Sequence, residues 1–90
     1  MYINYEWDEA KRQDTLTTRG VDFAAMARFD WTMALVLEDT RADYGEPRFR
    51  ALGLIDDRLF AVVVTPRGDA LRVISLRKAN ARERRRWQNA

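Results

Sequence analysis

Apolar and polar residues alternate along this chain with the periods of strands and short helices. The alternating stretch Tyr2–Glu6 predicts a short strand. Asp8 suits the N-cap of a helix and Gly20 suits its end, so the sequence predicts a helix over Glu9–Arg19. Threonines lower the helix propensity of this segment, and the helix therefore depends on tertiary packing for its stability.

Asp22 is the expected N-cap of a second short helix. Phe23, Met26 and Ala27 follow it and lie about one turn apart, so they share one face of that helix. An apolar face of this kind is typical of packing in a core, and we assign these residues to the core.

Beyond Asp30 the pattern changes to that of strands. A polar loop at Glu38–Pro47 and turns at Asp56-Asp57 and Pro66–Asp69 divide this part of the chain. Between these connections the pattern predicts a four-strand antiparallel meander. Its strands are Met33–Leu37, Arg48–Ile55, Leu59–Thr65 and Ala70–Arg77.

Regular alternation along the last strand predicts which residues share each of its faces. One face would carry Leu71, Val73, Ser75 and Arg77, and the other Arg72, Ile74 and Leu76.

Asn80 and Glu83 have the spacing of a capping box at the start of a C-terminal helix. That helix is basic and has almost no apolar stripe, so it either frays or is held by a partner. Residues 1–90 are therefore predicted to form one α+β domain. It has a short N-terminal strand and two helices, then the four-strand antiparallel meander and a short basic C-terminal helix.

The composition excludes several kinds of chemistry. The 90 residues include no cysteine and no histidine, so the chain has no thiol nucleophile, no zinc ribbon and no imidazole acid or base. No apolar run approaches the roughly 20 residues of a membrane helix, and the N-terminus does not resemble a secretory signal. We therefore expect a cytoplasmic protein that has no contact with a membrane.

Charge is distributed unevenly, although the net charge is only +2. The segment from Arg72 to Trp87 holds seven basic residues and one acid, whereas the remainder is acidic overall. A basic C-terminal end predicts a polyanion or an acidic protein as its partner. A solvated helix face that binds nothing is the alternative.

Arg77 and Lys78 leave the last strand close to the N-terminus of the final helix, where backbone N–H groups also favour anions. Arg48 and Arg50 share one face of an earlier strand and could lie on the same side of the sheet. Such a cluster could hold a phosphodiester and stabilise the charge that develops during its cleavage. RNA supplies its own 2′-hydroxyl nucleophile, so a ribonuclease needs mainly positioning and charge stabilisation. Strand-end charges in solvent remain the structural alternative.

Other site chemistry is weakly indicated. The carboxylate pairs Asp56-Asp57 and Glu38-Asp39 fall in a turn and a loop, and turn chemistry accounts for both. The chain has no P-loop and no dinucleotide-binding glycine pattern. We expect neither a metal nor a cofactor.

In order along the chain, a set of short motifs resembles the BrnT family, the toxins of type II toxin–antitoxin modules. The resemblance covers about residues 5 to 87 and is most specific in the last strand. The motifs are Tyr5-Glu6-Trp7-Asp8 with Lys11, Gly20-Val21-x-Phe23, Gly45-Glu46-x-Arg48-Phe49, Leu52-Gly53 and Arg72-Val73-Ile74-Ser75-x-Arg77-Lys78-Ala79 followed by Glu83.

This resemblance implies a RelE-like fold and an endoribonuclease, independent of metal, that cleaves RNA and arrests translation. It also implies neutralisation by a BrnA-like antitoxin with a ribbon–helix–helix region, in a two-plus-two complex that contacts operator DNA only through the antitoxin. Carried over by position, the implied functional residues are Arg48, Arg72, Arg77, Lys78 and Glu83.

Two departures from the family pattern bear on catalysis. Thr18-Arg19-Gly20 stands where the family commonly has lysine–histidine–glycine, and Trp87 stands where it commonly has tyrosine. Glu83 is then the remaining candidate for proton transfer, or it serves only as the cap residue. A catalytically weakened homologue that binds an antitoxin as a co-repressor is the alternative function, and direct binding of nucleic acid by the basic helix is a third.

Overall fold

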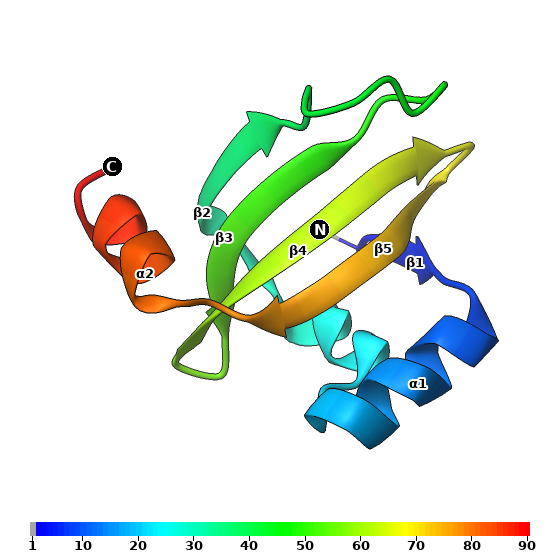
Figure 1. Cartoon of the computed structure of the whole chain (residues 1–90), viewed down its shortest axis with the longest axis horizontal. Helices are drawn as coiled ribbons and strands as arrows, with labels where there is room; N and C mark the ends of the chain where they lie inside the picture. The colour runs from blue at the N-terminus through cyan, green and yellow to red at the C-terminus, as the bar shows by residue number, and fades with distance from the viewer. Residues whose placement is uncertain (1) are drawn as a thin grey trace.

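A five-stranded mixed sheet is the centre of the computed structural model, which describes residues 2–90 (Figure 1). The order of the strands across the sheet is β1-β5-β4-β3-β2. The strands are β1 (Asn4–Glu6), β2 (Asp30–Glu38), β3 (Phe49–Ile55), β4 (Arg58–Arg67) and β5 (Ala70–Lys78). The helices are α1 (Glu9–Arg19), the 3₁₀ helix η1 (Phe23–Arg28) and α2 (Ala81–Gln88).

The antiparallel pairing of β2 with β3, β3 with β4 and β4 with β5 follows the predicted order. A four-strand meander is nevertheless an incomplete description, because β1 also joins the sheet and pairs parallel to β5, with Tyr5 opposite Leu71. The strand at Tyr2–Glu6 was predicted, but alternation within a strand carries no information about which distant strand it pairs with. The sheet is therefore mixed and has β1 and β2 at its two edges.

The helix caps and the hairpin turn predicted from the sequence are present in the structure. Asp8 caps α1 by accepting from the backbone N–H of Lys11, and Gly20 ends it in the left-handed conformation. Asp22 caps the second helix as expected, although that helix is 3₁₀ rather than α. Asp56 and Asp57 both have positive φ, which is the conformation of a two-residue hairpin turn.

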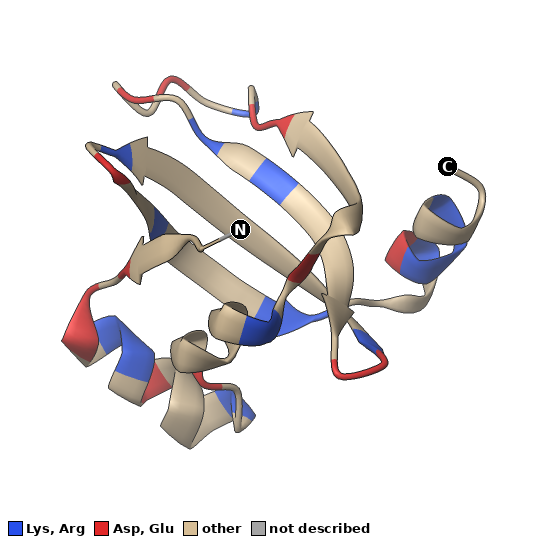
Figure 2. Ribbon diagram, turned by 180° about the vertical axis from the view of Figure 1, so that it is seen from behind, with Lys and Arg blue, Asp and Glu red and all other residues tan. Residues whose placement is uncertain are grey.

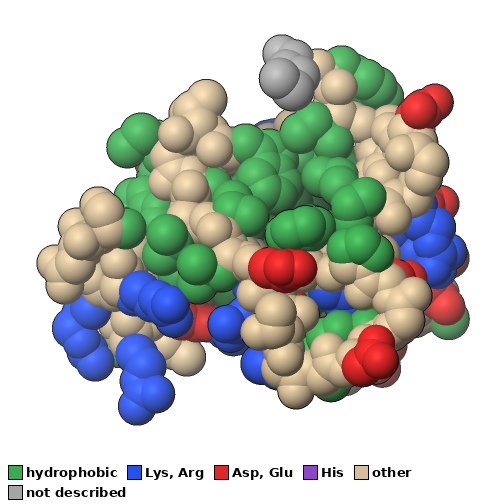
Figure 3. Space-filling view, turned by 90° about the horizontal axis from the view of Figure 1, so that it is seen from above, with side chains coloured by type: hydrophobic (Ala, Val, Ile, Leu, Met, Phe, Trp, Pro, Cys, Tyr) green, Lys and Arg blue, Asp and Glu red, His purple; other side chains and the backbone are tan. Residues whose placement is uncertain are grey.

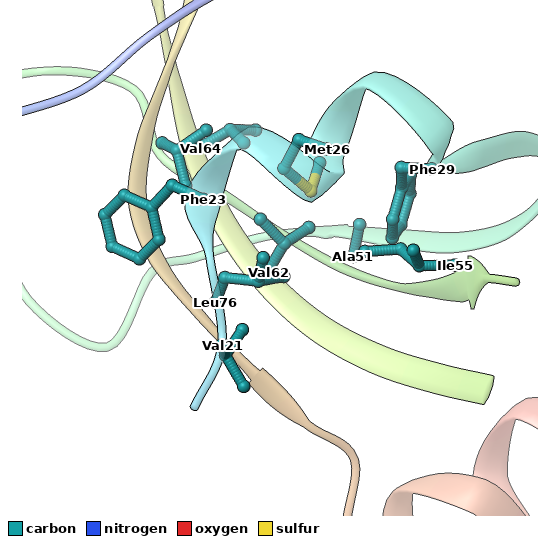
Figure 4. Packing of buried hydrophobic residues seen from close by; sticks show 10 residues of the cluster. Val21, Phe23, Met26, Phe29, Ala51, Ile55, Val62, Val64 and Leu76 are labelled. Atoms are coloured by element: carbon teal, nitrogen blue, oxygen red, sulfur yellow. The ribbon is translucent and has the colours of Figure 1, made fainter. Parts of the chain in front are cut away.

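The hydrophobic core lies between one face of the sheet and η1. Phe23 and Met26 of η1 are completely buried, and Figure 4 shows their side chains beside those of β3, β4 and β5. Ala27, assigned to the core from its spacing, is exposed instead. Helix α1 lies on the same side of the sheet as η1 (Figure 2), but each of its residues keeps part of its surface exposed. Among residues 2–90, no helix lies across the opposite face of β2–β5, and this face is available for a site.

A bulge in β5 decides which residues reach that open face. The register shifts between Val63 and Val64 of β4, so Ile74 has no direct partner. Val73 and Leu76 are consequently both buried in the core, whereas Ser75 and Arg77 lie on the open face. The predicted faces of this strand were therefore wrong, because strict alternation has no allowance for an extra residue.

The predicted capping box at the start of α2 is confirmed. Asn80 accepts from the backbone N–H of Glu83 at 2.8 Å, and the Glu83 carboxylate accepts from the backbone N–H of Asn80 at 2.9 Å. The other end of the helix is held by the Trp87 indole, whose Nε1 donates to the carbonyl of Met33 at 2.9 Å. These contacts hold α2 beside β2 and β3 without a buried apolar stripe.

Within residues 2–90 no helix is long and apolar enough to cross a membrane.

Candidate functional site

A pocket of about 170 Å³ lies on the open face of the sheet, where β2–β5 meet α2. Its floor is apolar and includes Leu35, Leu37, Leu52 and Val63 from three neighbouring strands. Its charged residues are Arg41, Arg50, Arg77, Glu83 and Arg86. We call this set of residues the basic pocket. Four guanidinium groups against one carboxylate make it suited to bind an anion.

Arg77 and Glu83 form the best-defined contact in the basic pocket. The Arg77 guanidinium donates from both terminal nitrogens to the two carboxylate oxygens of Glu83, each at 2.8 Å. This hydrogen bonding is the main cause that lowers the pKa of Glu83 and raises the pKa of Arg77. At neutral pH both groups are therefore charged, and Glu83 is a weak base whose carboxylate is already engaged with Arg77 and with the helix cap.

Arg50 extends from near the start of β3 onto the same face. It lies directly across the sheet from Val63, which in turn pairs with Ser75. Its Nε atom is buried and has no hydrogen-bond partner among residues 2–90. A buried N–H donor without a partner is energetically costly, so this atom is suited to an acceptor supplied by a ligand.

Arg41 reaches the basic pocket from the loop between β2 and β3, where Asp39 positions it. The Asp39 side chain is only 1% exposed and accepts from Nε and Nη2 of Arg41 at 2.8 and 2.7 Å. Its oxygen also lies 3.4 Å from the Tyr44 hydroxyl. The bond from Arg41 is the main cause that holds the pKa of Asp39 well below its usual range. A buried anion thus fixes a largely exposed cation at the rim of the pocket.

The stability of this loop should depend on pH through Asp39. Because folding lowers the pKa of Asp39, its stabilising contribution is complete above about pH 4 and is lost as the pH falls toward the folded-state pKa. We expect Asp39→Asn to lower the free energy of unfolding at pH 7 and the difference from the parent to shrink below about pH 4. Urea unfolding at a series of pH values measures this. Asp14→Asn, on the exposed side of α1, is the matched control and should change little.

The structure brings together two of the five residues predicted as a site. Arg77 and Glu83 meet in the basic pocket, whereas the other three lie elsewhere. Arg48 pairs with Glu46 and stacks over the Tyr44 ring, with its Cζ 4.1 Å from the ring centroid. Arg72 lies 3.9 Å from Glu6 of β1. Lys78 is exposed and lines a different hollow, together with Asp57, Arg58 and Arg84.

Three residues of the basic pocket are not among the functional residues that the resemblance implies. Of these three, only Arg50 was named from the sequence, as a member of a possible phosphate-binding cluster. The signal for Arg50 is the alternation along β3, which places it on the face opposite the core. Arg86 belongs to a helix with several arginines, and nothing in that pattern distinguishes it. Arg41 lies in an irregular loop, and only the fold brings it to the site.

The sequence of the chain matches a family model over residues 7–83. That family is described as the ribonuclease toxin, BrnT, of type II toxin–antitoxin systems. The chain belongs to the BrnT family. No curated protein sequence matches it closely enough to be informative.

Membership of the BrnT family makes this chain a ribonuclease toxin of a type II module, with an antitoxin as its partner. The basic pocket of this BrnT-family chain has the charge to bind an anion. Across residues 2–90, no three Asp, Glu, His or Cys side chains gather as a set of metal ligands. The charged groups available to an RNA phosphate in this pocket are therefore guanidinium groups.

Proposed function

We propose that this chain is an endoribonuclease that binds the scissile phosphate of RNA in the basic pocket and thereby arrests translation. The observation that carries the proposal is the convergence of Arg41, Arg50, Arg77 and Arg86 on one pocket, with a buried and unpaired Nε on Arg50. Guanidinium groups bind phosphate oxygens in pairs, and they stabilise the negative charge that increases as the phosphate is attacked.

In this mechanism the RNA 2′-hydroxyl gives its proton to water and attacks the adjacent phosphorus atom. A 2′,3′-cyclic phosphate forms, and the bond from phosphorus to the 5′-oxygen of the next nucleotide breaks as that oxygen takes a proton from water. The arginines hold the phosphate in line for that attack, and they stabilise the charge on its two non-bridging oxygens. No metal is required for these roles. We further propose that Arg48, Arg72 and Lys78 contact the RNA backbone outside the pocket, where each contributes less than a pocket arginine.

We propose that Glu83 positions Arg77 and does not transfer a proton. Its carboxylate binds both the Arg77 guanidinium and the Asn80 backbone, and its lowered pKa makes it a poor base near pH 7. Glu83→Gln should therefore reduce the rate of cleavage only roughly 10-fold, through a less well fixed Arg77. The pH–rate profile should keep its shape. Loss of about 10² to 10⁴-fold together with loss of one limb of the profile would instead identify Glu83 as the general base.

We propose for this chain the fold, location and partner that its resemblance to the BrnT family implies. The fold is RelE-like, the toxin acts in the cytoplasm, and a BrnA-like ribbon–helix–helix antitoxin neutralises it in a two-plus-two complex. Contact with operator DNA is made by the antitoxin.

Cleavage of RNA by the purified chain tests the proposed activity. A single-stranded RNA with a chelator present should be cut by the parent, and Arg50→Ala should cut it far more slowly. Lys11→Ala removes an exposed cation from α1, away from the basic pocket, and should cut at the parent rate. Equal cleavage by the parent and by Arg50→Ala would overturn the assignment of the pocket.

The second candidate function is a co-repressor that binds the antitoxin without cleaving RNA. It is favoured by one specific observation, namely that the chain has no histidine and that its pocket carboxylate, Glu83, is already engaged. It predicts a stable complex with the antitoxin and no cleavage by the free chain. RNA cuts made by protein free of contaminating nuclease would eliminate it.

A further inference from the structure

The edge strand β2 is protected over its first half and open over its second half. Its register with β3 is irregular between Asp30 and Leu35, and Trp87 of α2 donates to the carbonyl of Met33 there, whereas Leu35–Glu38 pairs regularly with β3. Strand β2 has nine residues, of which Asp30 and Leu35–Glu38 are in register with β3, whereas β1 at the opposite edge has three residues. Its charges stand at its ends, Asp30 and Glu38, and the segment Trp31–Leu37 contains no lysine, arginine or proline. Proteins usually protect such an edge with charges, prolines or a covering element, because its free N–H and C=O groups attract a further strand.

The same edge exposes apolar side chains. The exposed fractions of Met33 and Val36 are 62% and 46%, which are high values for residues of this kind. Between β2 and the end of α2 lies a groove whose lining includes Met33, Ala34, Leu35 and Trp87. Figure 3 looks onto this edge and shows hydrophobic side chains gathered over it, next to the basic groups of α2. Contiguous apolar surface of this kind marks an interaction site.

The charges around this edge indicate the chemistry of its partner. Helix α2 is held against β2 by Trp87 and presents several exposed arginines. They are Arg82, Arg84, Arg85 and Arg86. A segment that covers the apolar edge and extends over α2 is therefore best matched when it is apolar along one side and acidic along the other.

We propose that the edge of β2 over Leu35–Glu38, together with the apolar groove at Met33 and Trp87, binds an extended apolar and acidic segment of the antitoxin. That segment adds a sixth strand to the sheet through backbone hydrogen bonds, a common mode of peptide recognition. The inference rests on the antitoxin partner of the proposed function and not on RNA cleavage. Leu35 and Leu37 line the basic pocket as well as belonging to β2, so acidic side chains of the bound segment lie at the pocket's rim and compete there with phosphate.

The test uses the product of the reading frame next to this chain's gene, produced together with the full chain. Hydrogen exchange of the complex should show slowed exchange of the β2 amides compared with the free chain. The double variant Met33→Lys, Val36→Lys should weaken the complex by at least about 10²-fold, because it places two charges in an apolar interface. Leu16→Lys is the matched control on α1, where the exposed fraction of Leu16 is 37%, and it should bind as the parent does.

Three results would overturn this proposal. They are unchanged exchange of the β2 amides in the complex, parental affinity of the double variant, and no complex with the wild-type chain. A free chain that dimerises and becomes monomeric in the double variant would assign the edge to a second copy instead. RNA cleavage measured on the same samples separates this inference from the proposed activity. The free double variant should keep that activity, because Met33 and Val36 lie outside the basic pocket.

Discussion

Arg77→Ala is expected to reduce RNA cleavage by at least about 10²-fold while the chain remains folded. Loss of a single pre-organised donor to a developing oxyanion typically costs 10² to 10³-fold in rate. Arg77 is held in place by two 2.8 Å bonds to Glu83 and therefore loses little freedom when it binds phosphate. The effect should fall mainly on the turnover rate, since three other guanidinium groups still attract the RNA.

Cleavage kinetics and thermal unfolding of the same samples measure this effect. Arg77 is partly exposed, and an exposed ion pair contributes little to stability, so the melting temperature should change by only a few degrees. Induction of the variant in cells should likewise leave growth unaffected where the parent arrests it. If Arg77→Ala cleaves RNA at the rate of the Lys11→Ala control, Arg77 has no role in catalysis.

Helix caps and turn residues predicted most of the fold, because each of them determines the conformation of only a few neighbouring residues. The helix Glu9–Arg19 begins and ends where its Asp and Gly caps stand, and the capping box of α2 has the predicted residues. The turn at Asp56-Asp57 also lies where the sequence placed it. Two features depend on long-range packing and have no such signal. They are the pairing of β1 with β5 and the bulge at Ile74.

The candidate site could be predicted only where its signals are local. Arg77 stands near the end of the last strand and Glu83 completes a helix cap, and both facts are local. The contribution of Arg41 depends on a buried Asp39 in an irregular loop, which hydrophobic periodicity cannot detect. The sequence thus identifies Arg77 and Glu83 separately and offers Arg50 as a neighbour on the sheet. The pairing of Arg77 with Glu83 and the contributions of Arg41 and Arg86 follow from the fold.

Gly53→Ala is expected to destabilise the fold by about 2 to 3 kcal/mol, as overpacking of a tight core does. Gly53 lies in β3 between the buried residues Ala51 and Ile55, and a Cβ built there would overlap the ring of Phe29. Figure 4 shows the Phe29 ring directed at this part of the strand. The φ angle of Gly53 is not positive, so alanine has no backbone strain here and the expected loss comes from the overlap alone.

Urea unfolding of two further variants isolates that cause. Gly68→Ala meets no atom within 4 Å but has a φ of 56°, so it should cost only the backbone strain, about 1 kcal/mol. Phe29→Leu replaces the ring that the new methyl group meets with a smaller side chain. Gly53→Ala should therefore lower the free energy of unfolding less in the Phe29→Leu background than in the parent. The double variant should then lose less stability than the sum of the two single losses, as expected for residues in contact. Additive losses would show instead that the strand moves away from η1 to accept the methyl group, and that the core on this face is looser than its burial indicates.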